Sequence, residues 1–305
     1  MYKSNIITKC FQKLVKNKDI RTFKKNIFYY CFFRLCRKFL NECIEVNIYN
    51  FKILASNKKN HTSHGLIKKC HFDDEHELST IKKFSKNNKI FLLDCGCNYG
   101  FYSFYTASLS NDNFVVSIEA SPNTSANFNK NLTLNKLSNI ILKNLAISNK
   151  DNEAVTLNES HNDWESSLNH NNFEDKKLTK INTMTIETIL KTHDLKDYFL
   201  FIKLDIEGHE LKAIEGGLNI IKKYEPIIII EFSKYIFDHD SNGINFLKNF
   251  LKEYDYSIYG TNKQEISVDK IITSLINLKK KYKTIGNYYL IKNNEKMKFF
   301  FLNNE

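Results

Sequence analysis

Three side chains that can carry a proton come directly after an apolar run in the second half of the chain. Residues 199–204 read FLFIKL, and Asp205, Glu207 and His209 follow them. Such a run is typical of a buried strand. A carboxylate at the end of a buried strand lies partly away from water, so its charge needs a partner or has a role in binding or catalysis. Asp205, Glu207 and His209 are therefore candidates for a base, with Asp205 first because His209 can point away on the following helix. Glu231, which ends a similar run, could bind substrate hydroxyls.

A glycine-bearing turn follows an earlier apolar run. Residues 90–100 read IFLLDCGCNYG, so a buried strand ends at Asp94, and a turn with Gly96, Asn98 and Gly100 leads into a helix. Glycine lets the backbone approach a ligand closely, and ligands of open α/β sheets bind at the carboxyl ends of strands. We expect Asp94, Gly96, Asn98 and Gly100 to contact a cofactor. Asn98 stands where the dinucleotide fingerprint GxGxxG has its second glycine, so a nicotinamide cofactor is disfavoured.

Two further positions narrow the choice of cofactor. Glu119 ends the next apolar run, residues 114–118, and a carboxylate there can accept hydrogen bonds from both hydroxyls of a ribose. The unphosphorylated ribose of S-adenosylmethionine suits such a carboxylate, whereas a phosphate would be repelled. Residues 144–147 read NLAI, and an adenine ring can lie against this backbone and the small side chain of Ala146. We therefore predict S-adenosylmethionine as the cofactor.

The elements that position these residues alternate between strand and helix, which is typical of a parallel sheet covered by helices on both faces. This predicts an α/β fold with a doubly wound, mostly parallel sheet and an antiparallel closing strand. Strands are expected near residues 89–94, 113–118, 139–145, 199–205, 227–232, 255–259 and 286–292. Helices are expected near residues 74–84, 100–109, 122–135, 209–222 and 243–254. The polar region 150–185 breaks this rhythm, and a lid that includes Trp164 is one interpretation of it.

The first part of the chain differs in charge from the rest. The formal net charge is +11; residues 1–90 hold 20 Lys and Arg against 7 Asp and Glu, and residues 91–305 hold 25 against 27. We assign residues 1–60 to a basic, helical amino-terminal extension and residues 61–305 to the α/β domain. The extension could contact an anionic membrane surface, or it could pack on its own domain or on a second subunit.

Within the extension, apolar residues at helical spacing predict helices over 4–18 and 22–42, and residues 44–56 favour strand. The most apolar early run, residues 27–40, is too short to span a membrane and contains Arg34, Arg37 and Lys38; no secretory signal is visible. Seven cysteines occur, an odd number without zinc-site spacing, so we expect reduced thiols in a cytoplasmic, or membrane-peripheral, protein.

Together these motifs resemble the FkbM-type methyltransferases over roughly residues 70–235. The resemblance rests on the DxGxNxG turn at Asp94, on EASP at Glu119, on the segments 144–148 and 183–190, and above all on the KxDxEGxE motif that contains Asp205. It implies a Rossmann-like methyltransferase fold and O-methylation, commonly of a sugar or a secondary metabolite. The acceptor would then be a small molecule or a glycan. Cys95 and Cys97 stand where the family usually has small or apolar residues.

Two other functions stay open at this point. A nucleic-acid methyltransferase would fit the net charge, but the Asp/Asn-Pro-Pro-aromatic motif of exocyclic-amine enzymes is missing at Asp205, and the acidic residues there would repel phosphates. A non-catalytic scaffold, or a membrane-associated assembly protein, could use the same domain, and cofactor binding separates it from an enzyme. The acceptor, the need for a metal and the oligomeric state do not follow from the sequence.

Overall fold

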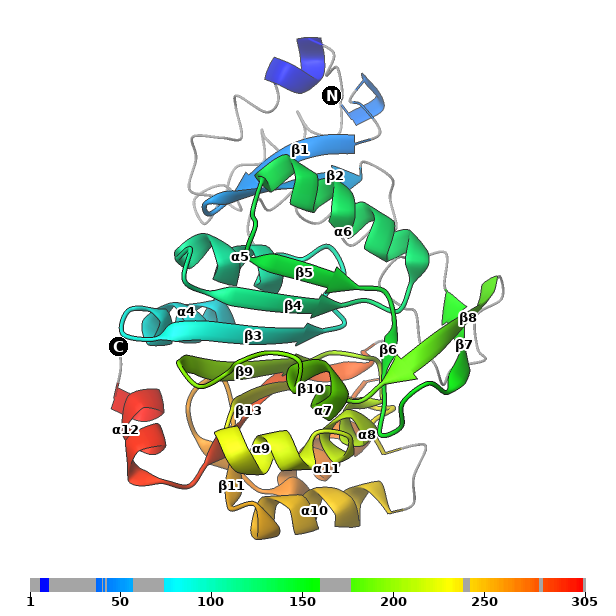
Figure 1. The fold of residues 1–305 in the computed structure, drawn as a ribbon. Coiled ribbons are helices and arrows are strands. Elements are labelled where there is room, and N and C mark those ends of the chain that lie inside the picture. Colours follow the sequence, from blue (N-terminus) through cyan, green and yellow to red (C-terminus); the bar gives the residue numbers. More distant parts are fainter. Residues whose placement is uncertain are drawn as a thin grey trace.

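A central sheet of eight strands organises the computed structural model, which describes residues 6–10, 37–39, 41, 43–56, 74–159, 177–237, 242–279 and 282–303. The strands are β3 (Lys89–Cys95), β4 (Phe114–Ile118), β5 (Ile140–Lys143), β9 (Tyr198–Leu204), β10 (Ile227–Ser233), β11 (Tyr256–Tyr259), β12 (Glu265–Ile266) and β13 (Thr284–Lys292). Their order in the sheet is β12-β11-β13-β10-β9-β3-β4-β5 (Figure 1). The strands from β10 to β5 are parallel, whereas β13 is antiparallel to β10 and β11. The predicted α/β fold with an antiparallel closing strand is confirmed.

The chain enters this sheet near its middle, at β3. It adds β4 and β5 on one side of β3 and later returns to add β9 and β10 on the other side (Figure 1). The direction in which the sheet grows therefore reverses at β3. Ligands of open α/β sheets bind beside the carboxyl ends of the strands at such a reversal. A ligand site is therefore expected at the ends of β3, β4 and β9.

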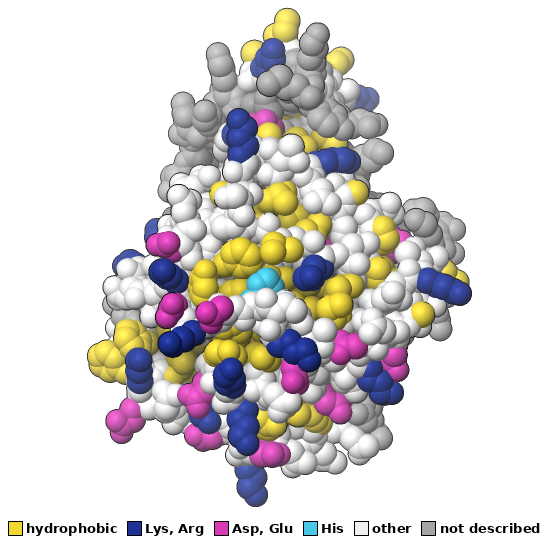
Figure 2. All heavy atoms as spheres, viewed as in Figure 1, with side chains coloured by type: hydrophobic (Ala, Val, Ile, Leu, Met, Phe, Trp, Pro, Cys, Tyr) yellow, Lys and Arg dark blue, Asp and Glu magenta, His cyan; other side chains and the backbone are white. Residues whose placement is uncertain are grey.

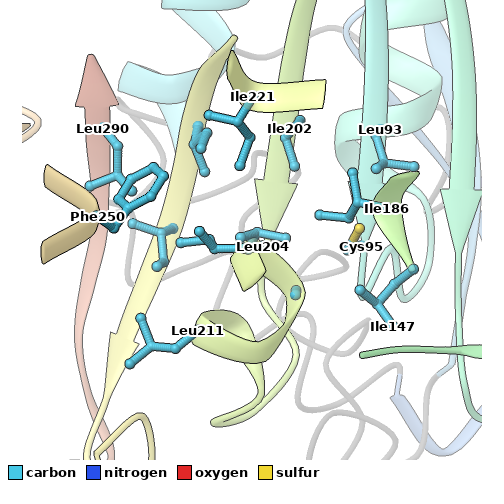
Figure 3. Packing of buried hydrophobic residues seen from close by; sticks show 14 of the residues in the cluster. Leu93, Cys95, Ile147, Ile186, Ile202, Leu204, Leu211, Ile221, Phe250 and Leu290 are labelled. Carbon is cyan, nitrogen blue, oxygen red and sulfur yellow. The ribbon is translucent and has the colours of Figure 1, made fainter. Parts of the chain in front are cut away.

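Helices cover both faces of the sheet, because successive side chains of a strand point to opposite faces. In β3, Ile90 and Leu92 belong to one apolar cluster, whereas Phe91 and Leu93 belong to the other. The first cluster includes side chains of α4 (Glu75–Ser85), α5 (Phe101–Leu109), α6 (Pro122–Asn135) and α12 (Glu295–Asn303). The second includes side chains of α7 (Ile186–Leu190), α8 (Glu210–Glu215), α9 (Leu218–Tyr224), α10 (Gly243–Glu253) and α11 (Val268–Ile276), some of which Figure 3 shows.

The single helix predicted over 209–222 is wrong, because the structure has two short helices, α8 and α9, on either side of Gly216 and Gly217. A Cβ atom at Gly216 would lie 2.4 Å from the carbonyl oxygen of Ser148, and one at Gly217 would lie 3.0 Å from the Ile186 side chain. The two glycines let this corner pack against segments that are far away in sequence. Glycine is also a weak helix former, which favours a break at this pair.

A β-hairpin within residues 43–56 packs onto the helices of the first cluster. It consists of β1 (Cys43–Ile48) and β2 (Phe51–Ser56). The N–H of Leu54 donates to Oδ1 of Asn131 on α6 (2.8 Å), and the N–H and carbonyl of Lys52 bond to the side chain of Asn135 (2.7 Å each). Asn131 also donates to the carbonyl oxygen of Tyr99 (3.3 Å). Two asparagines thus supply hydrogen-bond partners for the backbone at the outer edge of β2, and Asn131 connects this edge to the glycine turn.

Replacing Asn131 by Ala is expected to lower the free energy of unfolding by about 1–3 kcal/mol, because the Leu54 N–H and the buried Tyr99 carbonyl lose their partner. Urea unfolding followed by circular dichroism measures the change. Asn129→Ala is the matched control, since Asn129 is an exposed asparagine on the same helix, and it should change stability by less than about 0.5 kcal/mol. Equal effects of the two variants would contradict this account of the hairpin.

Much of the predicted amino-terminal extension lies outside the described residues. Of the two predicted helices, residues 6–10 are helical and Arg37–Phe39 form a short 3₁₀ helix, η2. The domain boundary at residue 60 stays a prediction, although the hairpin shares its core with the α/β domain. None of the helices in the described ranges is long and apolar enough to cross a membrane.

The region that breaks the strand and helix rhythm contains a small second sheet. Its strands are β6 (Ala146–Ile147), β7 (Ala154–Glu159) and β8 (Lys177–Met184), in the order β6-β8-β7. β7 and β8 are antiparallel, and β6 is parallel to β8. Trp164 lies outside the described residues, so its role in a lid stays a prediction.

Candidate active site

The turn after β3 and the ends of β4 and β9 meet at one edge of the sheet. The N–H groups of Gly96 and Cys97 both donate to the carbonyl oxygen of Ile118, which ends β4 (2.9 and 3.0 Å). On the other side, the N–H of Asp205 donates to the carbonyl oxygen of Cys95 (3.1 Å). The candidate cofactor residues and the candidate base therefore lie on adjacent, directly bonded loops.

The backbone of the turn requires its glycines. Gly96, Asn98 and Gly100 have φ angles of 78°, 48° and 90°, in the left-handed region that glycine adopts freely and asparagine tolerates. A Cβ atom at Gly96 would lie 1.9 Å from the carbonyl oxygen of Asp205, and one at Gly100 would lie 2.4 Å from the ring of Phe104. Gly96 thus allows the close approach of the two loops, and Gly100 allows the turn to lie on α5.

Glu119 is bonded to the same turn. Its Oε2 accepts a hydrogen bond from the N–H of Asn98 (3.0 Å), and its Oε1 accepts one from the N–H of Ser121 (2.9 Å). Nδ2 of Asn144 donates to the carbonyl oxygen of Glu119 (2.7 Å), which joins this loop to the segment before Ala146. Burial raises the pKa of the Glu119 carboxyl to about 7, against the effect of the two N–H donors.

The residues at this edge fit the predicted cofactor. Oδ1 of Asn98 is buried and has no hydrogen-bond partner within the described ranges, which is unusual for a buried polar atom and is relieved by a ligand that donates. Each carboxylate oxygen of Glu119 holds one donor and can accept another. A nucleoside with free hydroxyls supplies such donors. Contact of Gly96, Asn98, Gly100, Glu119 and the buried Ala146 with a cofactor stays a prediction.

Asp94 is bonded to α5. Its Oδ2 accepts a hydrogen bond from Oγ of Ser103 (2.5 Å), and Oγ of Ser103 also bonds to Oγ of Ser117 on β4 (2.7 Å). Burial raises the pKa of the Asp94 carboxyl to about 6. The side chain joins β3 to the helix that follows the turn, so it shapes the turn, and its predicted contact with a cofactor is untested.

Asp205 forms an ion pair with Lys203, a residue for which no role was predicted from the sequence. Nζ of Lys203 lies 3.0 Å from Oδ2 of Asp205, and their side chains are 1% and 37% exposed. Nζ also lies 5.3 Å from the centroid of the Tyr102 ring. Burial alone would lower the pKa of Lys203, but Asp205 and other carboxyls raise it above its ordinary value. Lys203 is therefore a buried cation, and its partner can be reached from solvent.

A second set of polar side chains, which the sequence did not indicate, surrounds this pair. Oδ2 of Asp74 accepts hydrogen bonds from the Tyr102 hydroxyl (2.8 Å) and from Nδ2 of Asn287 (3.1 Å). Burial raises the pKa of Asp74. An aspartate before a helix would be read as a cap, yet the Asp74 side chain makes no cap hydrogen bond to α4. Asn287 is the register partner of Glu231, so β13 and β10 bring both residues to the same edge.

Glu210 shapes the turn that follows β9. Its Oε1 accepts a hydrogen bond from the N–H of Ile206 (3.0 Å), and its Oε2 accepts one from the N–H of Gly208 (3.1 Å). The side chain is fully buried, and burial raises its pKa to about 7. The last acidic residue of the KxDxEGxE motif therefore bonds to the backbone of its own turn.

The other two candidate bases lie on this turn. Glu207 has a left-handed φ of 54°, and His209 is buried with Nε2 3.1 Å from Oγ of Ser148. His209 thus contacts the segment after β6. Their catalytic roles stay predictions, as does that of Asp205, whose side chain is 37% exposed and paired with Lys203.

Comparison with known proteins found similar chains among methyltransferases. The model of the methyltransferase FkbM domain matches residues 94–258, whereas no curated protein matches the chain. Similar solved structures include methyltransferase FkbM from Methylobacillus flagellatus KT, with 20% identity over 74% of this chain and 52% of that chain and a TM-score of 0.41. Precorrin-6y C5,15-methyltransferase from Geobacter metallireducens GS-15 has 11% identity over 73% of this chain and 90% of that chain, with a TM-score of 0.36. This chain thus spans about half the length of the Methylobacillus protein.

Proposed function

Because the chain belongs to the FkbM methyltransferase family, we propose that it transfers a methyl group from S-adenosylmethionine to a hydroxyl group of a sugar, a glycan or a secondary metabolite. The observation that supports this most directly is the hydrogen bond between the Glu119 carboxylate and the N–H of Asn98. This bond brings a carboxylate that can accept hydrogen bonds from ribose hydroxyls next to the turn. In that turn, Oδ1 of Asn98 lacks a hydrogen-bond partner within the described ranges.

Glu119 would bind the ribose of the cofactor, the turn around Asn98 would contact it through the backbone, and Ala146 would lie beside the adenine. When bound, S-adenosylmethionine supplies a methyl group on a sulfonium, which an oxygen nucleophile can attack. The protein then has to orient the acceptor oxygen and keep water away from it.

Asp205 would accept the proton that the acceptor hydroxyl loses. Its side chain is 37% exposed and forms an ion pair with the buried Lys203 at 3.0 Å. Glu231 on β10 and its register partner Asn287 on β13, on the next two strands along the same edge, would hydrogen-bond to the acceptor and orient it. A positioned base of this kind contributes a factor of about 10² to 10⁴ to the rate.

The charge distribution supports a small-molecule or glycan acceptor over a nucleic acid. Lys and Arg side chains are interspersed with Asp and Glu over the face that Figure 2 shows, and they do not gather in one basic patch there. A cytoplasmic location and membrane contact through residues 1–60 stay proposals. Liposome flotation of the protein with and without residues 1–45 tests the membrane contact, and flotation that survives the deletion would exclude the extension as the anchor.

Calorimetric titration with S-adenosylmethionine tests the cofactor, and labelled methyl transfer to a panel of glycans, glycolipids and hydroxylated metabolites tests the acceptor class. We expect saturable binding and incorporation of label into a compound with free hydroxyls. No binding at millimolar concentrations would refute the proposal that the protein is an enzyme, and a non-catalytic scaffold would be the remaining function. Binding without transfer to any hydroxyl compound would refute only the acceptor class.

Replacing Glu119 by Gln is expected to weaken S-adenosylmethionine binding about 10- to 100-fold at about pH 8, because a hydrogen bond to a charged group contributes about 1.5–3 kcal/mol. In the unaltered protein, affinity should fall as the pH is lowered through about 7, since protonation removes the charged acceptor. Calorimetry at several pH values measures both effects. Glu153→Gln, at an exposed glutamate, is the control. A pH dependence that persists in Glu119→Gln would assign the titration to another group.

A further inference from the structure

Lys203 lies among more carboxyl groups than one cation can balance. The side chains that interact with it come from several neighbouring elements. They are Asp74, just before α4, Glu77 of α4, Tyr102 of α5, Asp94 of β3, Asp205 after β9 and Glu231 of β10. Five carboxylates around one buried ammonium group would leave a large uncompensated charge away from water. Some of these carboxyls must therefore be neutral.

Most of the acidic groups in this cluster have features of neutral carboxyls. Burial raises the pKa of Asp74, Glu77 and Asp94, and it raises that of Glu231 well above its ordinary value. The negative charges of Asp205 and of the other carboxyl groups near Glu231 also raise the pKa of Glu231. Within the described ranges, Glu231 also receives no hydrogen bond that would favour its charged form.

Asp205 differs from these groups in its geometry. It contacts Nζ of Lys203 directly, at 3.0 Å, and over a third of its side chain is exposed. The Tyr102 ring, 5.3 Å from Nζ, restrains the ammonium group from the side of α5, and the Tyr102 hydroxyl is itself fixed by Asp74. The charge of Lys203 is thus held against one carboxylate, the one that the acceptor can reach.

We propose that Lys203 is a positioning residue whose direct ion pair holds the Asp205 carboxylate in place as the accessible base. This proposal deepens the proposed function and rests on it. Its electrostatic content can nevertheless be measured without cofactor, acceptor or turnover, so a failure of the proposed function would not imitate a failure of this proposal.

Carbodiimide coupling of glycine ethyl ester to carboxyl groups, followed by peptide mass spectrometry, reports the pH at which Asp205 becomes half-reactive. On the full chain, from about pH 4 to about pH 8, Lys203→Met is expected to raise this midpoint by about 1–3 pH units, the usual influence of an adjacent cation. Circular dichroism confirms that each variant is folded. An unchanged midpoint in a folded Lys203→Met variant would overturn the proposal.

Two further variants make the test decisive. Lys203→Met combined with Asp74→Asn also removes one of the buried carboxyl groups that Lys203 faces, which serves if the single variant unfolds, and it should show the same upward shift. Lys248→Met removes an exposed lysine whose Nζ lies 2.7 Å from Asp269, and it should leave the Asp205 midpoint unchanged.

Discussion

Replacing Asp205 by Asn is expected to lower the turnover number for methyl transfer about 10²- to 10⁴-fold, the contribution of a positioned general base. The affinity for S-adenosylmethionine should stay within about a factor of three, because the Asp205 carboxylate bonds to Lys203 and the turn is bonded to Glu119. Asparagine keeps the size of the side chain and loses only its charge and basicity. Labelled methyl transfer and calorimetry on the same preparation measure the two quantities separately.

Asp269→Asn is the matched control for this variant, since Asp269 also pairs with a lysine, Lys248, but on the surface. Its turnover number should equal that of the unaltered protein. Unchanged turnover in Asp205→Asn would rule out Asp205 as the base. In that event, loss of turnover in Glu207→Gln or His209→Gln would assign the role to one of the other two candidates on the same turn.

Replacing Gly96 by Ala is expected to lower the free energy of unfolding by about 2–5 kcal/mol, a large part of the stability of a typical domain. Two costs add: the left-handed φ of 78°, and a Cβ atom that would lie 1.9 Å from the carbonyl oxygen of Asp205. Because the loops after β3 and β9 must then separate, cofactor binding should be lost as well. Urea unfolding and calorimetry measure the two effects.

Gly286→Ala separates these two costs. Gly286 has a φ of 97°, and a Cβ atom there would meet nothing within 4 Å, so this variant carries only the conformational cost of about 1–2 kcal/mol. Gly96→Ala should therefore be the more destabilised of the two variants. Equal destabilisation would mean that the loops adjust freely and that their close approach does not require glycine.

The features that could be predicted from the sequence have local signals. The apolar runs that form β3, β4 and β9 each end in a polar residue or a turn, and this pattern alone locates the glycine turn, Glu119 and Asp205. Parallel strands then bring their carboxyl ends to one edge, which is why residues from separate segments could be expected to lie together.

The features that escaped prediction depend on contacts between distant segments. Lys203 interrupts an apolar run, and only the carboxyls of neighbouring elements explain how it can be 1% exposed. In the sequence, Asp74 is indistinguishable from an ordinary helix cap, because its bonds to Tyr102 and Asn287 come from distant segments. The break at Gly216 and Gly217 likewise reflects the approach of Ser148 and Ile186, which no helical periodicity encodes.

The contact between Asp74 and Asn287 joins residues 213 positions apart, and β13, which carries Asn287, inserts between β10 and β11. A chain emerging from the ribosome exposes α4 and the parallel strands long before residue 287 is made. Until then Asp74 lacks one hydrogen-bond donor, and the strand position between β10 and β11 is unoccupied. The loops after β3, β4 and β9, which hold the other candidate site residues, are thus all synthesised before the strand that carries Asn287 and closes the sheet between β10 and β11.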